Sequence, residues 1–283
     1  MKIYLKYFSI VFLNILTLVK VLAHPAIGIV KNSKGEIFFT DTQRIWKISS
    51  NGKSKLVVVS NVHTHELSID KNDNIYGEHL WYGSSKWSHY IWKYSYDGKF
   101  SKHVTDSEGF RSDFSFNLDN FGNMYWLESG KKESTLLRKT TNDKIEILGT
   151  YPTTDVRWQF ADSKGDFYFI DDNDLKKIYQ NKLTTISKDL DGLVGENATR
   201  KPNNNTFGIW NDTLGNIYVA VTSMNKVLRI EKNGQKTIIY SSKNDWQPTG
   251  GLFDNKKNLW VLEANNKNQQ RVIKVLKSKI SVQ

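Results

Sequence analysis

The chain has 283 residues, 24% of them charged, with a formal net charge of +11 and no cysteine. The lack of cysteine excludes disulfide bonds, thiolate nucleophiles, thiolate metal ligands and lipid attachment through a cysteine. Aromatic residues make up 13% of the chain and include nine Trp, so a chain of this length holds enough large apolar side chains to bury one core without covalent crosslinks.

The N-terminus predicts a secretory signal peptide over residues 1–23. Two lysines precede an apolar run over residues 7–19, and residues 21–23 (Val-Leu-Ala) have the small-residue pattern of a cleavage site. The run is shorter than the roughly 20 apolar residues that a membrane helix needs, although an uncleaved anchor is the alternative. We expect cleavage, a secreted or periplasmic location, and a mature chain of residues 24–283 with no stable membrane span.

A repeat runs through the mature chain in six copies. Each copy has an apolar strand, a turn that resembles Asp-x-x-Gly-Asn, and a second strand that begins with an apolar residue followed by an aromatic one. In chain order the copies cover residues 28–38, 67–76, 116–125, 160–168, 209–218 and 252–260. Equivalent turn positions recur about every 44 residues, a period typical of repeats built from four strands.

A third strand follows each hairpin and carries a basic residue at one fixed place. The six residues are Lys47, Lys93, Arg138, Lys177, Arg229 and Lys274. A groove for a polyanion is one interpretation of this set, but a ring of solvated charges on outer strands is favoured. Removal of the predicted signal peptide takes away three lysines and leaves a charge of +8 that is not clustered, so we expect no nucleic-acid partner.

Turn sequences after the third strand lead to a fourth strand in most copies, for example over residues 54–60 and 236–240. Six units of four strands predict an all-β fold, a single six-bladed β-propeller with four-stranded antiparallel blades over residues 24–283. We expect this domain to be a monomer. The sixth copy lacks a clear turn before its expected last strand at residues 279–282, so ring closure is the least defined part of the architecture.

The turn pattern is best kept over residues 248–254 (Pro-Thr-Gly-Gly-Leu-Phe-Asp) and 214–218 (Leu-Gly-Asn-Ile-Tyr). It resembles NHL repeats and the related six-bladed regucalcin/gluconolactonase group over the whole mature chain. The resemblance implies a divalent ion above the pore that polarises a lactone carbonyl and activates water. The group's ligands are not matched, however, since residues 24–28 (His-Pro-Ala-Ile-Gly) replace a segment with Glu and Thr249 replaces an Asp before glycine.

Polar residues gather where the first strands begin and the second strands end. These two places share one face of a propeller, the axial face, because the strands form antiparallel hairpins. The second-strand ends are Asp41, His79, Glu128, Asp171, Val221 and Glu263. The segments before the first strands add His63, His65, Glu66, Asp113 and Arg157. A binding or catalytic site is therefore predicted at this face.

The stretch of residues 63–79 shows the pattern at its clearest. A turn centre at Asn72 sets His65 across from His79 and Glu66 across from Glu78. Two directly opposed carboxylates repel unless a cation, a shared proton or a register shift separates them. A divalent ion would satisfy all four side chains.

We predict metal ligation by His65, Glu66, Asp113 and Glu128. Zinc or another transition metal would favour the histidines, and calcium would favour the carboxylates. The predicted catalytic residues are Glu78 and His79. The alternative is that the histidines are exposed loop residues or hydrogen-bonded pore lining, and that Glu78 is solvated.

Ligand contact is predicted for His63, Trp81, Trp87, Arg157, Asp171 and Glu263. The two tryptophans lie in the loop of residues 80–89, where flat rings suit stacking on a sugar or another planar ligand, although packing on the neighbouring blade is the alternative. Arg157 falls opposite Asp171 in the expected register, which favours a structural ion pair over a substrate clamp. The same symmetry sets Glu263 opposite Thr249.

Two functions of different class follow from this pattern. The first is an exported, metal-assisted hydrolase, lactonase- or esterase-like, for a small molecule or carbohydrate. The second is a noncatalytic extracellular propeller that binds a sugar or a peptide through the aromatic loop and the pore face.

Overall fold

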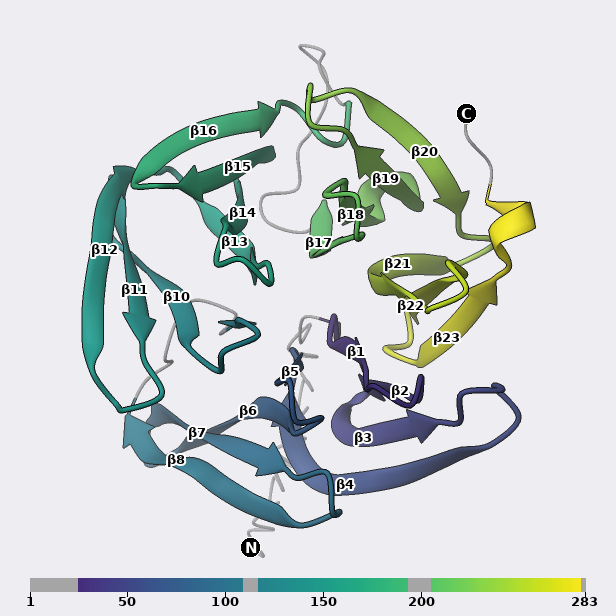
Figure 1. Ribbon diagram of the computed structural model, residues 1–283, viewed down its shortest axis with the longest axis horizontal. Coiled ribbons are helices and arrows are strands. Elements are labelled where there is room, and N and C mark those ends of the chain that lie inside the picture. The colour runs from purple at the N-terminus through teal and green to yellow at the C-terminus, as the bar shows by residue number, and fades with distance from the viewer. Residues whose placement is uncertain (1–24, 109–116, 193–204, 281–283) are drawn as a thin grey trace, which may run out of the picture.

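A computed structural model describes residues 25–108, 117–192 and 205–280. It confirms the predicted six-bladed β-propeller: six antiparallel sheets surround a central axis (Figure 1). The predicted signal peptide and the candidate Asp113 lie outside the described residues. Within those ranges no helix is long and apolar enough to cross a membrane.

Blades one to three come from the first half of the chain. Blade one contains β1 (Ile29–Lys31), β2 (Ile37–Thr40), β3 (Thr42–Ile48) and β4 (Lys55–Thr64). Blade two contains β5 (Ser68–Ile69), β6 (Ile75–Gly83), β7 (Lys86–Tyr94) and β8 (Phe100–Glu108). Blade three contains β9 (Asn117–Leu118), β10 (Met124–Ser129), β11 (Glu133–Lys139) and β12 (Ile145–Pro152).

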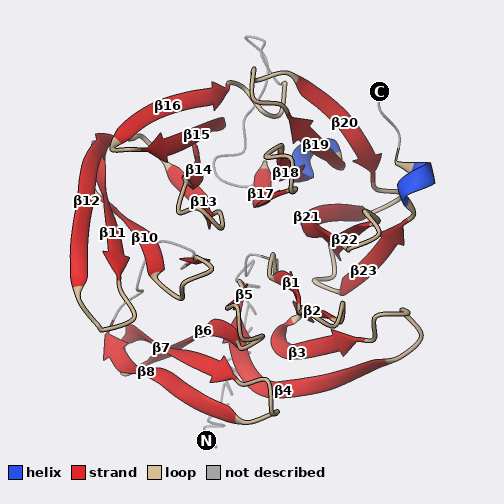
Figure 2. Cartoon of the chain, in the orientation of Figure 1, coloured by secondary structure: helices blue, strands red, loops and turns tan. Residues whose placement is uncertain are grey.

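Blades four to six complete the ring. Blade four contains β13 (Val156–Ala161), β14 (Phe167–Asp171), β15 (Asp174–Tyr179) and β16 (Lys182–Ser187). Blade five contains β17 (Thr206–Asn211), β18 (Ile217–Val221), η1 (Thr222–Met224), β19 (Lys226–Ile230) and β20 (Lys236–Ser241). Blade six contains β21 (Trp246–Phe253), β22 (Leu259–Asn265) and β23 (Gln270–Val275), followed by η2 (Lys277–Lys279). The first strand of each blade lies near the axis and the fourth forms the rim in blades one to five (Figures 1 and 2).

The repeated turn has one hydrogen-bond pattern that explains its sequence. In blade five, Asp212 Oδ1 accepts the N–H groups of Leu214 and Asn216 at 2.9 and 3.0 Å. Its Oδ2 accepts Asn216 Nδ2 at 2.9 Å and the Tyr218 hydroxyl at 2.8 Å. The pKa of Asp212 is lowered because these bonds outweigh the opposing effect of burial. Asp, Asn and the aromatic residue of the motif are thus one local unit.

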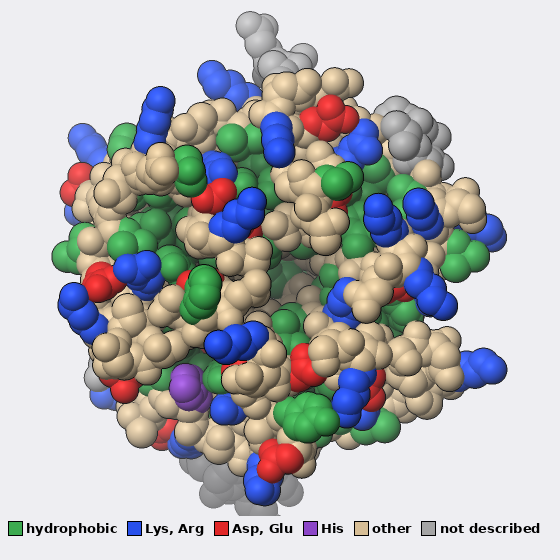
Figure 3. Space-filling model, in the orientation of Figure 1, with side chains coloured by type: hydrophobic (Ala, Val, Ile, Leu, Met, Phe, Trp, Pro, Cys, Tyr) green, Lys and Arg blue, Asp and Glu red, His purple; other side chains and the backbone are tan. Residues whose placement is uncertain are grey.

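The repeated basic residues are partnered rather than freely solvated, which corrects that interpretation. Each lies across from the first aromatic residue of the second strand, as Lys177 does from Tyr168 and Lys274 from Trp260. Lys177 also pairs with Asp166 at 2.6 Å. Lys and Arg side chains are spread around the whole face in Figure 3. These six residues contact groups of their own blades, and they do not form a free polyanion groove.

The core is a series of apolar clusters between neighbouring blades. Trp92 of blade two packs with Phe38 of blade one, and Trp260 of blade six packs with Phe39 of blade one. A four-stranded sheet cannot bury both faces alone, so each blade covers its neighbour. This packing between neighbouring blades positions the strand ends on the axial face.

Blade six closes the ring differently from the prediction. Among the described residues its sheet has three strands, and the expected strand at residues 279–282 is replaced at its start by η2. The cause is local: the Lys277 N–H donates to Asn258 Oδ1 at 3.0 Å, which turns the chain away from the edge of β23. β1 then packs beside β21, where a Cβ on Gly250 would lie 2.3 Å from the Ile27 carbonyl oxygen.

Candidate functional site

The candidate site is a set of histidines and glutamates on the axial face of blade two, here called the axial cluster: His63, His65, Glu66, Glu78 and His79. β4 carries the chain from the rim of blade one into blade two, and β6 supplies the last two residues. The His63 N–H donates to His79 Nδ1 at 2.8 Å. The sequence therefore located these five residues together, although the contacts differ from those expected.

The predicted pairing of His65 with His79 and of Glu66 with Glu78 is not formed. β5 is only two residues long, so the ladder of blade two ends before it reaches the cluster. The backbone of His65 bonds to blade one instead, where its carbonyl accepts the N–H groups of Ile27 and Gly28 at 2.9 and 2.8 Å.

The cross-strand neighbours of β6 lie on β7. Glu78 faces Ile91 and His79 faces Tyr90. The register of blade two thus comes from the long β6–β7 hairpin, and the segment before β5 is positioned by contact with the first blade.

The two loop histidines form a close pair. The Nε2 atoms of His63 and His65 are 2.9 Å apart, so one imidazole donates a proton and the other accepts it. Burial lowers the pKa of His63, although a hydrogen bond to the Leu80 backbone opposes the shift. Both side chains remain partly exposed. The pair is therefore a proton-handling group in reach of solvent.

Two buried carboxyl groups lie behind this pair. Glu78 is 3% exposed and Glu66 is 7% exposed. Burial raises the pKa of Glu66 well above its usual value, and the nearby Glu78 carboxylate raises it further. His89 Nδ1, also buried, lies 4.0 Å from Glu78 Oε1. The protonated form of Glu66 is therefore favoured by its burial and by the nearby Glu78 carboxylate.

His89 was not predicted as a site residue, although its position on the strand indicated a buried side chain. It lies two residues before the fully buried Ile91, and alternation along a strand puts both side chains on one face.

His79 belongs to an aromatic stack. Its ring is 4.8 Å from Tyr90 and 5.6 Å from Trp81, nearly parallel to both. Lys102 Nζ lies 4.4 Å from the Tyr90 centroid. Burial lowers the pKa of His79, and His63 and Lys102 lower it further. A partly exposed aromatic cluster therefore borders the imidazole pair.

Three residues predicted to contact a ligand lie outside the axial cluster: Arg157, Asp171 and Glu263. Asp171 is buried, and its Oδ1 accepts the N–H groups of Thr154 and Asp155 at 2.8 Å each. It faces Val156, and Arg157 instead pairs with Asp155 at 3.0 Å. The predicted ion pair between Arg157 and Asp171 is wrong, because a bulge at Trp158, with a φ of 30°, shifts the strand by one residue.

Glu263 is shifted for the same reason. The bulge in β21 sets it opposite Pro248 rather than Thr249. Its side chain is fully buried and accepts hydrogen bonds from Tyr240, Ser242 and Arg271. Like Asp171, Glu263 is bonded within the protein. Arg157 lines a cavity of about 300 Å³ between blades three and four.

The predicted metal ligands are not gathered into one set. Glu128 is exposed on β10 of blade three, opposite Thr135, while Glu66 is buried in blade two. Among the described residues, no group of three or more His, Asp and Glu side chains is arranged to hold a metal ion. The described donors therefore do not fit a resident divalent ion.

No protein-family model and no curated protein matches the chain. Solved structures match it at low identity. A gluconolactonase from Xanthomonas campestris is 10% identical with a TM-score of 0.63, over 88% of this chain and 85% of the other. An inactive variant of virginiamycin B lyase from Staphylococcus aureus, solved with quinupristin, is 15% identical with a TM-score of 0.55. The match covers 88% of this chain and 80% of the lyase chain.

A chain in a nidogen/laminin complex is 13% identical with a TM-score of 0.57, over 87% of this chain and 95% of the other. At such identities the likeness shows the fold alone. The predicted resemblance to gluconolactonase-like propellers is confirmed at that level, and the same fold also serves a lyase and a protein found in a complex.

Proposed function

We propose that this protein is an exported hydrolase of ester or lactone bonds, with the axial cluster of blade two as its site. The observation that carries the proposal is the contact between the His63 and His65 imidazoles. It places an acceptor nitrogen and a donor N–H side by side, partly exposed, next to an aromatic surface. General acid–base catalysis of hydrolysis needs both functions in one place.

The reaction follows from the lowered pKa of His63. Burial favours the neutral form of the His63 imidazole. The ring nitrogen that accepts the hydrogen bond from its partner imidazole can instead take a proton from water as the water oxygen bonds to the carbonyl carbon. The C–O bond to the leaving group then breaks, and the departing alcohol oxygen takes the proton back. A lactone opens to a hydroxy acid by the same steps.

The residues around the pair have supporting roles. His79 accepts the backbone N–H of His63 and so holds that strand end in place. The Glu66 and Glu78 carboxyl groups stay buried behind the pair, and the raised pKa of Glu66 favours its uncharged form. His79, Trp81 and Tyr90 offer an aromatic surface for a sugar-like or planar substrate. No step is assigned to a metal ion, because the described residues do not gather a ligand set.

A panel of p-nitrophenyl esters and aliphatic lactones tests this proposal. We expect His63→Gln and His65→Gln to lower kcat/KM by about 100-fold or more, the range of general-base catalysis. Activity should rise with pH to a plateau with a midpoint below 6.5, because the pKa of His63 lies below that ordinary value.

His103→Gln is the matched control, since His103 lies on the rim strand β8 and packs against Tyr76. Equal activity in all three variants would contradict the proposal, as would failure of the folded protein to hydrolyse any member of the panel.

Noncatalytic binding of a sugar or peptide is the second candidate function. Tyr82 and Trp87 form an edge-to-face pair at the tip of the β6–β7 hairpin and are 62% and 38% exposed. Exposed aromatic pairs of this kind suit stacking on a ligand. An inactive protein that binds oligosaccharides or peptides, with binding weakened by Trp87→Ala, would favour this function over hydrolysis.

A further inference from the structure

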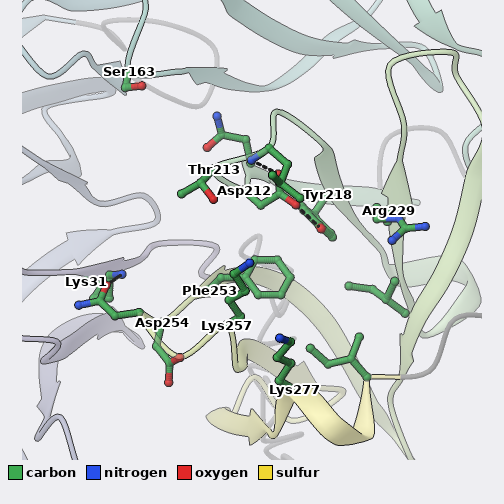
Figure 4. Close-up of a pocket in the computed structure, with 15 residues that line it drawn as sticks. Lys31, Ser163, Asp212, Thr213, Tyr218, Arg229, Phe253, Asp254, Lys257 and Lys277 are labelled. Carbon is green, nitrogen blue, oxygen red and sulfur yellow. Dashed lines mark hydrogen bonds between the residues drawn. The ribbon is translucent and has the colours of Figure 1, made fainter.

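A second cavity lies far along the strands from the axial cluster, beside the turns that join the first and second strands of blades five and six. Its volume is about 700 Å³ (Figure 4), within the range of small-molecule sites. Asp212 and Tyr218 come from blade five, Phe253 and Asp254 from blade six, and Lys31 from blade one. The axial cluster lies on blade two and contributes no residue to this lining, so the cavity is a separate feature.

Positive charge dominates the lining. Four cationic side chains surround the cavity (Lys31, Arg229, Lys257 and Lys277), against the two carboxylates of Asp212 and Asp254. Figure 4 shows Lys257 and Lys277 beside Phe253, with Lys31 and Arg229 on either side. Both carboxylates are engaged inside their own turns, where each accepts Asn and aromatic donors. Because four cations face only two carboxylates, the lining keeps an excess of positive charge.

The lysines of the cavity have no carboxylate partner within the described chain. Arg229 pairs with Glu231 at 2.8 Å, and Asp254 lies 3.7 Å from Lys274, which is outside the lining. Lys31 Nζ donates to the neutral Asn255 Oδ1 at 2.6 Å. Burial lowers the pKa of Lys31 even though Asp254 opposes the shift. A bound anion would offset the cost of burying this ammonium group.

Arg229 adds an unused donor. Its Nε is buried and has no hydrogen-bond acceptor among the described residues, while its Nη2 donates to Glu231. A buried donor without an acceptor is costly. An anionic oxygen in the cavity would supply one.

Part of the remaining lining of the cavity is apolar. The Phe253 and Tyr218 rings are 4.8 Å apart at 60°, and Ile239 and Ile280 extend this surface. Leu214 is 68% exposed at the rim of the cavity. A ligand that fits both parts has a planar or aliphatic body and one anionic group.

The neighbouring groove shows that this charge is not a property of every blade. It lies between blades four and five, has a volume of about 450 Å³, and carries three lysines against four carboxylates. Lys31, Lys257 and Lys277 do not line it. The positive character of the larger cavity is therefore specific to the junction of blades five, six and one.

We propose that this cavity binds a small organic anion, a carboxylate or sulfonate with an aromatic or aliphatic body. Its cationic side chains hold the anionic group, and Phe253 and Tyr218 contact the body. The site is independent of the proposed hydrolase activity, because it uses none of the axial cluster.

Fluorescence titration with 8-anilinonaphthalene-1-sulfonate tests the proposal on the folded full chain. We expect saturable binding that naphthalene-2-carboxylate displaces and the uncharged naphthalene-2-methanol does not. The double variant Lys257→Gln/Lys277→Gln should raise Kd at least tenfold, and Lys31→Gln should raise it further. Near-ultraviolet circular dichroism confirms that each variant is folded.

Lys164→Gln/Lys232→Gln in the neighbouring groove is the matched control and should leave Kd unchanged. Because Lys31 is half-buried, the exposed pair Lys257 and Lys277 carries the test even if Lys31→Gln unfolds. Equal binding by the Lys257→Gln/Lys277→Gln variant and the control would overturn the proposal, as would equal displacement by the neutral naphthalene compound or no saturable binding.

Discussion

At the scale of single residues, Glu66 shows how burial sets chemistry. Its carboxyl group is almost fully excluded from water and close to a second carboxyl group, on Glu78. Charging it costs free energy in the folded protein but not in the unfolded chain, where the carboxyl group is hydrated. The folded pKa is therefore raised well above the ordinary value of 4.5, and Glu66 stabilises the fold only while it carries a proton.

This pKa shift predicts a pH dependence of stability. The folded state holds a proton on Glu66 that the unfolded state releases above about pH 4.5, so the free energy of unfolding falls as pH rises from that value to the folded pKa. Glu66→Gln keeps a neutral side chain at every pH. We expect the variant to gain stability relative to the wild type as pH rises from 4 to 8, measured by urea unfolding.

Glu133→Gln provides the control, because Glu133 is exposed at the start of β11. A stability difference between Glu66→Gln and wild type that stays constant over this pH range would contradict the shift.

At the scale of elements, the position of β6 depends on the small size of Gly77. A Cβ on Gly77 would lie 2.2 Å from Trp92 Cζ2 and 2.8 Å from Thr64 Cγ2. Trp92 is fully buried, and its Nε1 donates to Thr64 Oγ1 at 2.9 Å. Thr64 in turn donates to the Glu78 carbonyl at 2.8 Å. The close approach of β4, β6 and β7 therefore fixes where Glu78 and His79 lie.

We expect Gly77→Ala to lower the free energy of unfolding by about 1–3 kcal/mol, the usual cost of overpacking a filled core. It should also lower any hydrolase activity, because Trp92 and Thr64 must move.

Gly83→Ala on the same strand is the comparison. Its new Cβ would meet only Trp81 Cδ1, at 3.8 Å, so its effect should stay within about 0.5 kcal/mol. Similar losses in both variants would show that the contact with Trp92 does not constrain β6.

At the scale of the whole molecule, apolar packing between blades holds the ring together. Five buried clusters span the boundaries between blades, and the one that joins blades four, five and six contains Trp158, Phe207 and Val261. Ring closure uses the same principle, since β1 packs beside β21 where Gly250 admits the Ile27 carbonyl. Stability therefore depends on apolar contacts between neighbouring blades.

This packing predicts that chelation leaves the fold unchanged. We expect Tm to be the same with and without EDTA, and less than one equivalent of divalent metal in protein purified without added ions. An ion present at 100 times its Kd would contribute about 2.7 kcal/mol, which is a Tm shift of roughly 5–10 °C for a domain of this size. A fall of that size on chelation would restore the metal-assisted hypothesis.

The repeat was predictable because its signals are local. In four of the six turns the Asp bonds to groups two, four and six residues ahead, as Asp70 bonds to Asn72, Asn74 and Tyr76. Such a unit is complete within one short segment of chain. The number of blades, the turns and the alternation of buried residues follow from it.

The site was predicted in outline, because hairpin geometry alone carries strand ends to the axial face. The contacts within the site were not predictable from the sequence, because they depend on packing against neighbouring blades. A single bulge at Trp158 changed the partner of Arg157, and two backbone bonds to blade one moved His65 away from β6. Register along a strand is set by what packs against it, and a one-residue change alters every opposed pair.

The sequence by itself therefore determined the propeller, its six blades and the face on which His63, His65, Glu66, Glu78 and His79 lie, because each rests on local periodicity. Only the tertiary structure decided that two imidazoles meet, that Glu66 shares its surroundings with Glu78, and that Lys31 and Lys277 border one cavity. Glu66 precedes β5 and Glu78 lies on β6, and Lys31 and Lys277 lie far apart along the chain. These relations exist only because the blades close into a ring and exclude water between them.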